Sequence, residues 1–402
     1  MKFIHTGDWH IGKIVNEFSM LEDQRFVLNQ LINIIEEERP NALVIAGDLY
    51  DRSIPPVEAV ELLDDIFSRI LLELNVPILA IAGNHDSAER LSFASNILTK
   101  HGLHIAGTFS SEIKRVVLED EFGPVNFYLV PYADPKEVRH IYKDEEISSH
   151  DIAMRKVVER LKQNMKADEK HVMVAHGYIT FMADPEEGRD ENIIIDGERS
   201  GLKICDSERP LSIGGSDLIS GKYFDCFNYT ALGHLHSRQK VGSERMRYSG
   251  SLLKYSLSEA NHIKGVTIVN LDRNGEVTTA FKALNSRRDI RIIKGPLNEL
   301  ISPSVYSCDN VEDYVYAVLT DEGELVDPIS KLRAVYPNIM GLRRETLTEK
   351  ELSRTSAAAG HNTKSKLELF EEFYGAIVGR QLSEDRLDII SEVIEAVEKE
   401  AM

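Results

Sequence analysis

The feature that most constrains this chain is a series of five short polar motifs, each of which directly follows an apolar, strand-like segment. In chain order they read GDWHIG, GDLYDR, GNHD, AHG and GHLH, and they begin at residues 7, 47, 83, 175 and 233. Polar residues at the carboxyl ends of parallel strands meet at one edge of a sheet, where open α/β sheets bind their ligands. The first three motifs follow strands of one predicted sheet, and three motifs in register are harder to explain by chance than any one of them. Together with the two later strand-end motifs, they predict one shared site.

The first hundred residues alternate between strand and helix patterns. Short apolar segments at Phe3–Thr6, Ala42–Ala46 and Pro77–Ala82 have the length and composition of buried strands. Between them, an apolar stripe with helical spacing covers Met20–Glu38, and a second helical pattern follows the Pro55–Pro56 pair. This βαβαβ order predicts a mainly parallel sheet with helices packed on its faces.

The rest of the chain divides into smaller units. Strand patterns become more frequent after Ile105, and DRNGE at 272–276 is a strong hairpin turn. SRTSAAAGHNTK at 353–364 is small and polar, as linkers are, and two amphipathic helical stripes follow it. The expected organisation is an α/β domain at 1–284, a small α/β capping domain at 285–347, a linker at 348–364 and a partner-binding helical pair at 365–402.

Composition excludes several classes of protein. The 402 residues include 66 acidic and 47 basic side chains, a formal charge of −19, which argues against a free-standing nucleic-acid binder unless metal ions or a partner supply positive charge. No apolar run is long enough to span a bilayer, and the first residues lack the apolar core of a signal peptide. Three widely spaced cysteines indicate neither a disulfide framework nor a zinc ribbon. We therefore expect a cytoplasmic protein without membrane contact.

The polar residues at the five strand ends are oxygen and imidazole donors. Such donors suit Mn, Fe or Zn, and the set is too large for one tetrahedral ion. Two neighbouring ions would use the whole set, bind the oxygens of a phosphate and activate a water for attack on phosphorus. The candidate metal ligands are Asp8, His10, Asp48, Asn84, His176, His234 and His236.

His85 and Asp86 are the candidate catalytic residues beside these ligands. The imidazole of His85 could protonate the leaving oxygen, and Asp86 could orient that ring and stabilise its charged form. Plainer roles stay open from the residues alone. Asp48 could cap the next segment, Asn84 could belong to a turn, His85 could be structural or bind substrate, and Asp86 could be a helix N-cap.

The five motifs, in this order, resemble the full motif set of the calcineurin-like metallophosphoesterases. Two further stretches, SERPLSIGG from Ser207 and RYSGSLLKYSLSE from Arg247, are similar to those of SbcD-type nuclease subunits of bacterial SbcC–SbcD DNA-repair complexes. The resemblance covers the whole chain and implies the layered metallophosphoesterase fold, with β-sheets flanked by helices, a small capping domain and a C-terminal helical pair.

The same resemblance implies how the ligands divide between two ions. Asp48 would bridge the ions, and His85 would be the catalytic histidine that binds neither. Mn²⁺ is the metal that the resemblance favours, with Mg²⁺, Fe and Zn as alternatives that residue chemistry does not separate. One ligand set would be Asp8, His10, Asp48 and His236, and the other Asp48, Asn84, His176 and His234.

The activity that the resemblance implies is metal-dependent DNA cleavage. It would include 3′–5′ exonuclease action on duplex ends and endonuclease cutting of hairpins and single strands, in DNA repair, recombination and replication. The protein would form a homodimer that works with two SbcC-type ATPase chains, docked through residues 365–402, and would be associated with the nucleoid when it acts on DNA. Arg245 and Arg247, near the second stretch, are candidate phosphate contacts.

Two other functions remain as alternatives. A phosphatase or phosphodiesterase of small molecules or proteins would share every metal ligand, but it would not need a capping unit and a tethered helix pair. A non-catalytic scaffold that binds DNA or a partner is disfavoured by the intact ligand set and by His85. We therefore expect a phosphodiester hydrolase that acts on DNA.

Overall fold

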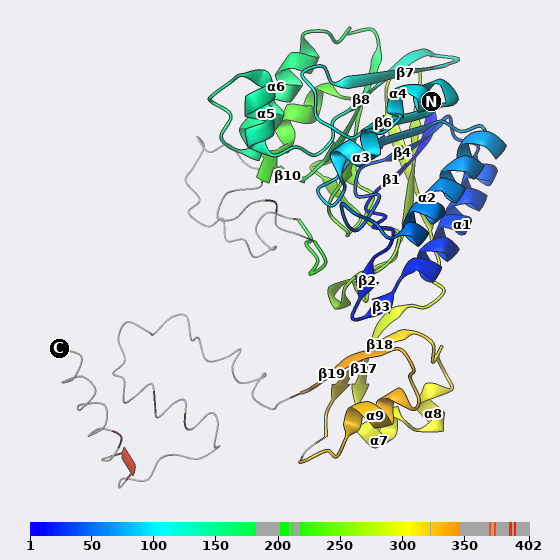
Figure 1. Cartoon of the computed structure of the whole chain (residues 1–402), viewed down its shortest axis with the longest axis vertical. Helices are drawn as coiled ribbons and strands as arrows, with labels where there is room; N and C mark the ends of the chain where they lie inside the picture. The colour runs from blue at the N-terminus through cyan, green and yellow to red at the C-terminus, as the bar shows by residue number, and fades with distance from the viewer. Residues whose placement is uncertain are drawn as a thin grey trace.

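The computed structural model of the chain has a large body and a smaller one, drawn above and below each other in Figure 1. It describes residues 1–181, 202–208, 211, 218–321 and 323–345, and five single helical residues: Phe370, Tyr374, Arg386, Leu387 and Ile390. The expected linker at 348–364 and the rest of the expected helical pair at 365–402 lie outside the described residues. None of the helices in the described part of the chain could cross a lipid bilayer.

Two six-stranded sheets form the large body and face each other across a buried apolar layer. The first sheet has, from edge to edge, β16 (Val277–Ala283), β15 (Gly265–Leu271), β1 (Lys2–Thr6), β4 (Ala42–Ile45), β5 (Ile78–Ile81) and β6 (Leu103–Ala106). The second has β13 (Gln239–Val241), β14 (Ser243–Tyr248), β12 (Tyr229–Gly233), β9 (Lys170–His176), β8 (Gly123–Leu129) and β7 (Lys114–Asp120). The run from β1 to β6 is parallel, as predicted, and so is the run from β14 to β8.

Alternation along the strands explains why each sheet is buried on both faces. In β1 and β4, Phe3 and Val44 point into the layer between the sheets, where Tyr229 of the second sheet also lies. Their neighbours Ile4 and Leu43 point to the opposite face of the first sheet, where the helices pack. Successive side chains of a strand point to opposite faces, so an uninterrupted apolar run gives a strand with two dry faces.

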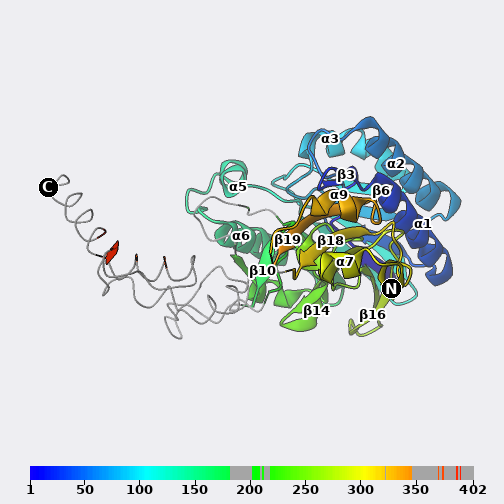
Figure 2. The same cartoon turned by 90° about the horizontal axis from the view of Figure 1, so that it is seen from below.

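Helices cover the two outer faces of this sandwich. The first sheet is covered by α1 (Leu21–Glu38) and α2 (Val57–Ser68), and the second by α5 (Pro135–Tyr142) and α6 (His150–Lys162). Figures 1 and 2 place the two helix pairs on opposite sides of the large body. The layered α/β fold that the sequence and the family resemblance predict is confirmed. Shorter elements of this body are β2 (Ile14–Val15), β3 (Phe18–Ser19), α3 (Ala88–Ser92), α4 (Ser95–Leu98), β10 (Tyr178–Thr180) and β11 (Leu218–Ser220).

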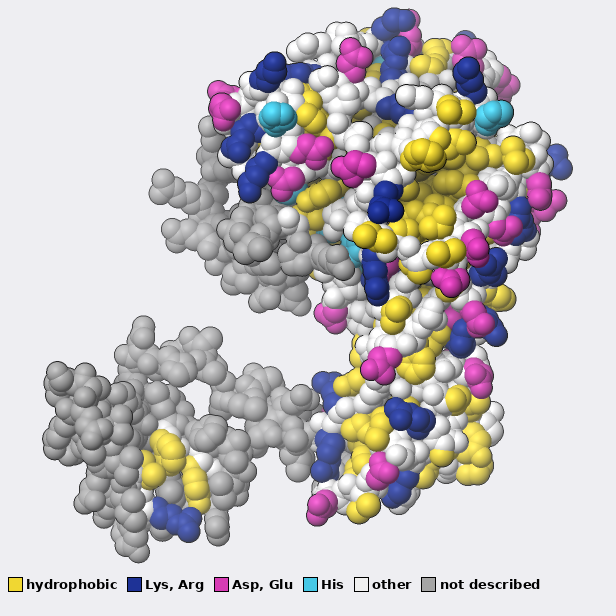
Figure 3. Space-filling view, in the orientation of Figure 1, with side chains coloured by type: hydrophobic (Ala, Val, Ile, Leu, Met, Phe, Trp, Pro, Cys, Tyr) yellow, Lys and Arg dark blue, Asp and Glu magenta, His cyan; other side chains and the backbone are white. Residues whose placement is uncertain are grey.

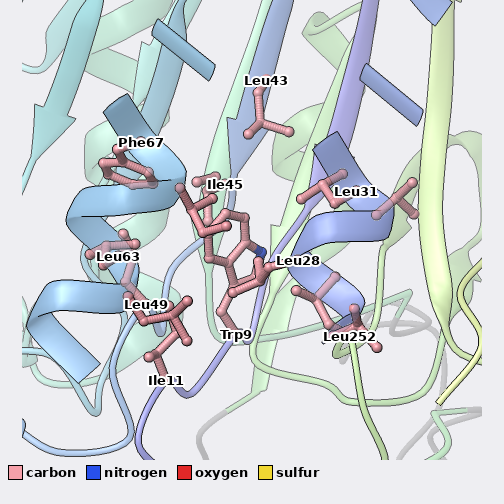
Figure 4. Close-up of a cluster of buried hydrophobic side chains, with 14 of the residues drawn as sticks. Trp9, Ile11, Leu28, Leu31, Leu43, Ile45, Leu49, Leu63, Phe67 and Leu252 are labelled. Atoms are coloured by element: carbon pink, nitrogen blue, oxygen red, sulfur yellow. The ribbon is translucent and has the colours of Figure 1, made fainter. Parts of the chain in front are cut away.

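Trp9 joins the first polar motif to the apolar core. Its indole is 1% exposed and lies between α1 and α2, with Leu28 on one side and Leu63 on the other (Figure 4). The indole N–H donates to the Thr6 hydroxyl at 3.0 Å, and the ring meets that of Phe67 edge-on. This anchor holds the segment that follows β1 against the core, and that segment carries two candidate metal ligands.

The smaller body is a three-stranded parallel sheet with its own apolar core. Its joint with the large body lies at the first turn of α1, where the buried Asp23 accepts hydrogen bonds from Arg288 (2.8 and 3.1 Å) and from the Tyr314 hydroxyl (2.8 Å). Ile290 and Tyr314 also belong to the apolar core that α1 covers. The joint therefore combines apolar packing with these hydrogen bonds. The elements are β17 (Ile290–Gly295), α7 (Leu297–Leu300), α8 (Pro303–Tyr306), β18 (Tyr314–Leu319), α9 (Pro328–Arg333) and β19 (Ile339–Arg344).

Candidate metal centre

The five motifs meet where the carboxyl ends of strands from both sheets come together. The first three follow β1, β4 and β5, which are neighbours in the first sheet, and the last two follow β9 and β12, which are neighbours in the second. Six of the seven candidate ligands are buried and Asn84 is partly exposed. The structure therefore brings the predicted ligands to one edge, and the site spans both layers of the sandwich.

One group of donors, called here the His236 cluster, consists of Asp8, His10 and His236. Each offers one ligand atom, and these three atoms lie within 4.8 Å of one another. The Nε2 atoms of His10 and His236 are 3.0 Å apart. Two imidazole nitrogens at this distance face each other across a space in which a cation can bind both.

The second group, called here the His176 cluster, consists of Asp48, His176 and His234, whose ligand atoms also lie within 4.8 Å of one another. The side-chain oxygen of Asn84 is 2.9 Å from His176 Nε2 and 3.0 Å from His234 Nδ1. Asp48 connects the two clusters, since its Oδ2 is 3.5 Å from His176 Nε2 and 3.6 Å from His10 Nε2.

Three buried polar atoms at the site have no hydrogen-bond partner among the described residues: Asp8 Oδ2, His10 Nδ1 and His234 Nε2. A buried polar atom without a partner costs free energy, and a cation in the His236 cluster would satisfy Asp8 Oδ2. The unpartnered nitrogens of His10 and His234 are instead the ring atoms opposite those that face the two clusters. Carboxylate and amide oxygens with imidazole nitrogens are suitable ligands for several divalent metals. The residues fit two ions, and the His236 and His176 clusters together indicate a dimetal site.

The pKa values of Asp8 and Asp48 are shifted in opposite directions. Burial raises the pKa of Asp8 well above its usual range, and the nearby charge of Asp48 acts in the same direction. Burial also acts to raise the pKa of Asp48, but His176 and the other imidazoles outweigh it and hold that pKa well below its usual range. Burial acts to lower the pKa of His176, and Asp48 raises it to about 9. His176 therefore carries a proton that a metal ion must displace.

The backbone at the site adopts conformations that side chains rarely allow. Asp8, His10, Asp48 and His234 have positive φ angles of 53°, 47°, 52° and 103°. The loops are held by backbone bonds from Asp8 N–H to the Gly47 carbonyl at 3.0 Å and from His10 N–H to the Asp48 carbonyl at 2.9 Å. Strained non-glycine residues concentrate at functional sites, where the surrounding structure holds them in place.

Glycine allows the closest approach between these loops. A Cβ atom at Gly83 would overlap the Asp48 carboxylate, so the third motif can pass directly over the second only with glycine at this position. The neighbouring His85 N–H donates to Asp48 Oδ1 at 2.9 Å. Because Oδ1 accepts this hydrogen bond, Oδ2 is the Asp48 oxygen that lies toward His10 and His176.

His85 is buried next to the His236 cluster, with its ring centroid 4.6 Å from that of His10. Its Nδ1 is 2.9 Å from the backbone carbonyl of Asp51, and the Asp51 carboxylate is 3.9 Å away. A carbonyl oxygen only accepts, so Nδ1 carries the proton of the neutral ring and Nε2 is the nitrogen that can exchange one. Sequence reasoning missed Asp51, although it stands three residues after Asp48 in GDLYDR.

Asp86 contacts the loop backbone. Its carboxylate accepts N–H groups from Gly83 at 2.9 Å, Tyr50 at 2.9 Å and Leu49 at 3.1 Å. Asp86 thereby connects the third motif to the second. The residue that accepts from His85 Nδ1 is Asp51, and not Asp86 as expected from the sequence. The cap of α3 is Ser87, whose hydroxyl accepts the Arg90 N–H, so the N-cap alternative for Asp86 is wrong.

Gln24 of α1, which sequence reasoning missed, donates to the His10 carbonyl at 2.7 Å and accepts the Gly12 N–H at 2.9 Å, so it holds the first motif from both sides. No sequence signal distinguishes it from other polar helix residues.

The two arginines expected to contact phosphate differ in exposure. Arg245 is exposed, but Arg247 is buried beside Glu244, so the prediction of a phosphate contact is wrong for Arg247.

Two family models match the chain. Residues 1–238, more than half of the 402, match the calcineurin-like phosphoesterase family. Residues 286–376 match the SbcD_C family, described as the type 5 capsule protein repressor C-terminal domain. The second match begins after β16 and includes the three-stranded sheet.

Solved structures similar to this chain include TT1561 of Thermus thermophilus, with 13% identity over 70% of this chain and 98% of that chain and a TM-score of 0.36. A 5′-nucleotidase precursor from the same organism has 14% identity over 71% and 54%, with a TM-score of 0.33. A dimetal phosphatase from Danio rerio has 11% identity over 70% and 98%, with a TM-score of 0.38. The family assignment rests on the family models: the chain belongs to the calcineurin-like phosphoesterases, hydrolases of phosphoester bonds, and carries the additional C-terminal domain of SbcD-type nuclease subunits.

Proposed function

We propose that this chain is the nuclease subunit of an SbcC–SbcD-type complex, with 3′–5′ exonuclease activity on duplex DNA ends and endonuclease activity on hairpins and single strands. The observation that carries the proposal is the combination of two His/Asp clusters bridged by Asp48 with an SbcD_C domain in one chain. DNA repair, recombination and replication are the processes in which such an activity serves.

In this proposal the two ions are Mn²⁺. Asp8, His10 and His236 hold one, and Asn84, His176 and His234 hold the other, with Asp48 shared between them. When bound, the pair would neutralise a DNA phosphate and activate the attacking water. Both ligand sets stand on short segments that follow strands, so the donors are fixed before substrate arrives.

His85 acts as the general acid in this proposal. Its Nδ1–H donates to the Asp51 carbonyl, which leaves Nε2 as the nitrogen that would give its proton to the leaving 3′ oxygen. The carboxylate of Asp51 lies 3.9 Å from the same nitrogen and stabilises the charged ring. Asp86 has a positioning role, because it holds the backbone of the two loops that carry Asp48 and His85.

The test is cleavage of end-labelled duplex and hairpin DNA by the full chain with Mn²⁺, alongside His85→Ala and with bis-p-nitrophenyl phosphate as a small substrate. We expect DNA cleavage by the wild type and a loss of about 10²- to 10⁴-fold in the variant, which should still bind Mn²⁺. Cleavage of the small ester alone, even after addition of an SbcC-type ATPase and ATP, would contradict DNA as the substrate.

The ATPase partner is proposed to bind residues 365–402, of which the structure describes only five. Two short amphipathic helices bury too little apolar surface to be stable alone, so a partner is expected to cover them. Deletion of 365–402 should abolish co-purification with SbcC and leave Mn²⁺-dependent ester hydrolysis intact. Unchanged co-purification would contradict this docking site.

One exposed apolar surface supports the homodimer. Ile54, Val57, Phe93 and Ile97 are between 68% and 82% exposed, and Figure 3 shows hydrophobic side chains gathered on the face that carries α2, α3 and α4. Exposed apolar patches of this kind mark interaction sites, and we propose that a second copy covers this one. Phe93→Glu should convert a dimer to a monomer in sedimentation equilibrium.

Val326→Glu is the matched control for that experiment. Val326 is 76% exposed but lies just before α9 in the smaller body, outside the proposed dimer surface. Its substitution should leave the dimer unchanged. A dimer that survives Phe93→Glu, or a wild type that is monomeric, would contradict this surface as the dimer contact.

A further inference from the structure

We propose that Ser207, Glu259 and Lys264 form a hydrogen-bonded chain that fixes the ring tautomer of His236 and thereby directs its Nε2 to one of the two ions. The inference deepens the proposed function and rests on it, because it concerns how one ligand of the dimetal site is positioned. Neither the five motifs nor the family matches assign a role to these three residues.

The tautomer follows from the proton of a single hydroxyl group. Ser207 Oγ is 2.7 Å from His236 Nδ1 and donates to Glu259 Oε1 at 2.6 Å. A serine hydroxyl has one proton, and a carboxylate only accepts. Ser207 must therefore accept from His236, which places the ring proton on Nδ1 and leaves the Nε2 lone pair for a metal ion.

Lys264 keeps the Glu259 carboxylate ionised, so that this carboxylate accepts hydrogen bonds and donates none. The buried ammonium group donates to Glu259 Oε2 at 2.5 Å, and Glu259 itself is fully buried. The same ammonium group donates to the Ser251 hydroxyl at 2.9 Å and to the His236 carbonyl at 2.8 Å. The ion pair of Lys264 and Glu259 is hydrogen-bonded to groups that are themselves fixed by the fold. The Glu259 carboxylate is therefore a fixed acceptor for the Ser207 hydroxyl.

The backbone of His236 is held by the same two segments as its ring. Its N–H donates to Glu208 Oε1 at 2.6 Å, and its carbonyl accepts from Lys264. Side chains from 207–208 and from 259–264 thus contact the ring, the amide and the carbonyl of one candidate ligand. Such partners of a metal-binding histidine fix ring orientation, and their loss typically weakens metal affinity by about 10- to 100-fold.

The experiment compares Mn²⁺ binding by full-length wild type, Ser207→Ala, Ser207→Thr and Ser256→Ala. Ser256 is a matched control because its hydroxyl donates to the same Glu259 oxygen, at 2.9 Å, and its other neighbour is the Ser258 hydroxyl. Bound Mn²⁺ is counted from the electron paramagnetic resonance signal of the free ion. We expect two Mn²⁺ in the wild type, one site weakened about 10- to 100-fold in Ser207→Ala, and wild-type binding in Ser256→Ala and Ser207→Thr.

A second readout does not depend on metal. Nitrogen-15 NMR of histidine-labelled, metal-free protein distinguishes the two neutral tautomers, with the His236 signal assigned from a His236→Gln variant. We expect the Nδ1–H form in the wild type and a mixture of tautomers in Ser207→Ala. Unchanged Mn²⁺ constants and an unchanged tautomer in Ser207→Ala would overturn this inference alone. A wild type that binds no Mn²⁺ would overturn the dimetal proposal and the inference with it.

Discussion

The His176 cluster and the His236 cluster are held in different ways. In the His176 cluster, the Nδ1–H of His176 donates to the backbone carbonyl of Ala46 at 2.8 Å, within the segment that follows β4. In the His236 cluster, His236 is held by side chains of Ser207, Glu208 and Lys264, which come from two segments of the chain. The ring of His176 is thus oriented by a backbone carbonyl, whereas the ring of His236 is oriented by a side chain.

The two histidines therefore differ in how far substitution can disturb them. A backbone carbonyl cannot be removed by substitution, so the His176 cluster follows directly from the strand-end motifs that define the fold. The partners of His236 lie in or near the two stretches that are similar to SbcD-type subunits. We therefore expect side-chain substitutions to change metal affinity more readily at His236 than at His176.

Asp48→Asn should have the largest effect on hydrolysis, because Asp48 contacts histidines of both clusters. Loss of one carboxylate charge weakens the hold on both ions, and we expect hydrolysis to fall on the order of a thousandfold and Mn²⁺ stoichiometry to fall from two to at most one. Steady-state rates and Mn²⁺ titration measure the two quantities. Retention of two tightly bound ions would break the view that Asp48 joins the two clusters.

Asp23→Ala tests a long-range contact outside both clusters. It leaves Arg288 and the Tyr314 hydroxyl without their buried partner, so the free energy of unfolding should fall by about 3–5 kcal/mol. Glu22→Ala is the matched control, because its pairs with Arg287 and Arg288 are exposed and should contribute only about 0–1 kcal/mol. Urea denaturation of the metal-free proteins measures both, and equal losses would contradict the assigned difference.

The pH dependence of Mn²⁺ binding should report the proton that His176 carries in the metal-free protein. The Asp48 charge raises the pKa of His176 to about 9 against the effect of burial, whereas burial lowers the pKa values of His10 and His236. An ion at the His176 cluster must displace a proton below pH 9, so its affinity should rise about tenfold per pH unit between pH 6 and 8. Titrations across this range should show this steep dependence, and its absence at both sites would contradict a protonated His176.

The strand-end residues could be predicted from sequence because their chemistry and their position are both local. Asp8, His10 and Asp48 follow apolar segments, and the edge of a parallel sheet brings such residues together. Asp51 was missed because its backbone carbonyl, rather than its side chain, makes the closest contact with His85. The positive φ angle of His234 likewise has no sequence signal, since the surrounding structure imposes it.

Long-range contacts account for the remaining misses. Arg247 reads as a basic residue near a family stretch, but β14 buries it beside Glu244. Lys264 carries no motif, and its role follows only from the fold, which places it against Glu259 and His236. Sequence patterns locate residues along a strand or helix, but they do not report which distant segment packs against them.

The bridged dimetal centre is tested most directly by a crystal structure of the Mn²⁺-soaked protein with anomalous diffraction at the manganese edge. We expect two peaks about 3.5–4 Å apart, one in the His236 cluster and one in the His176 cluster, with the Asp48 carboxylate bound to both. A single peak, or two peaks without Asp48 between them, would contradict the bridged dimetal centre on which the proposed nuclease activity depends.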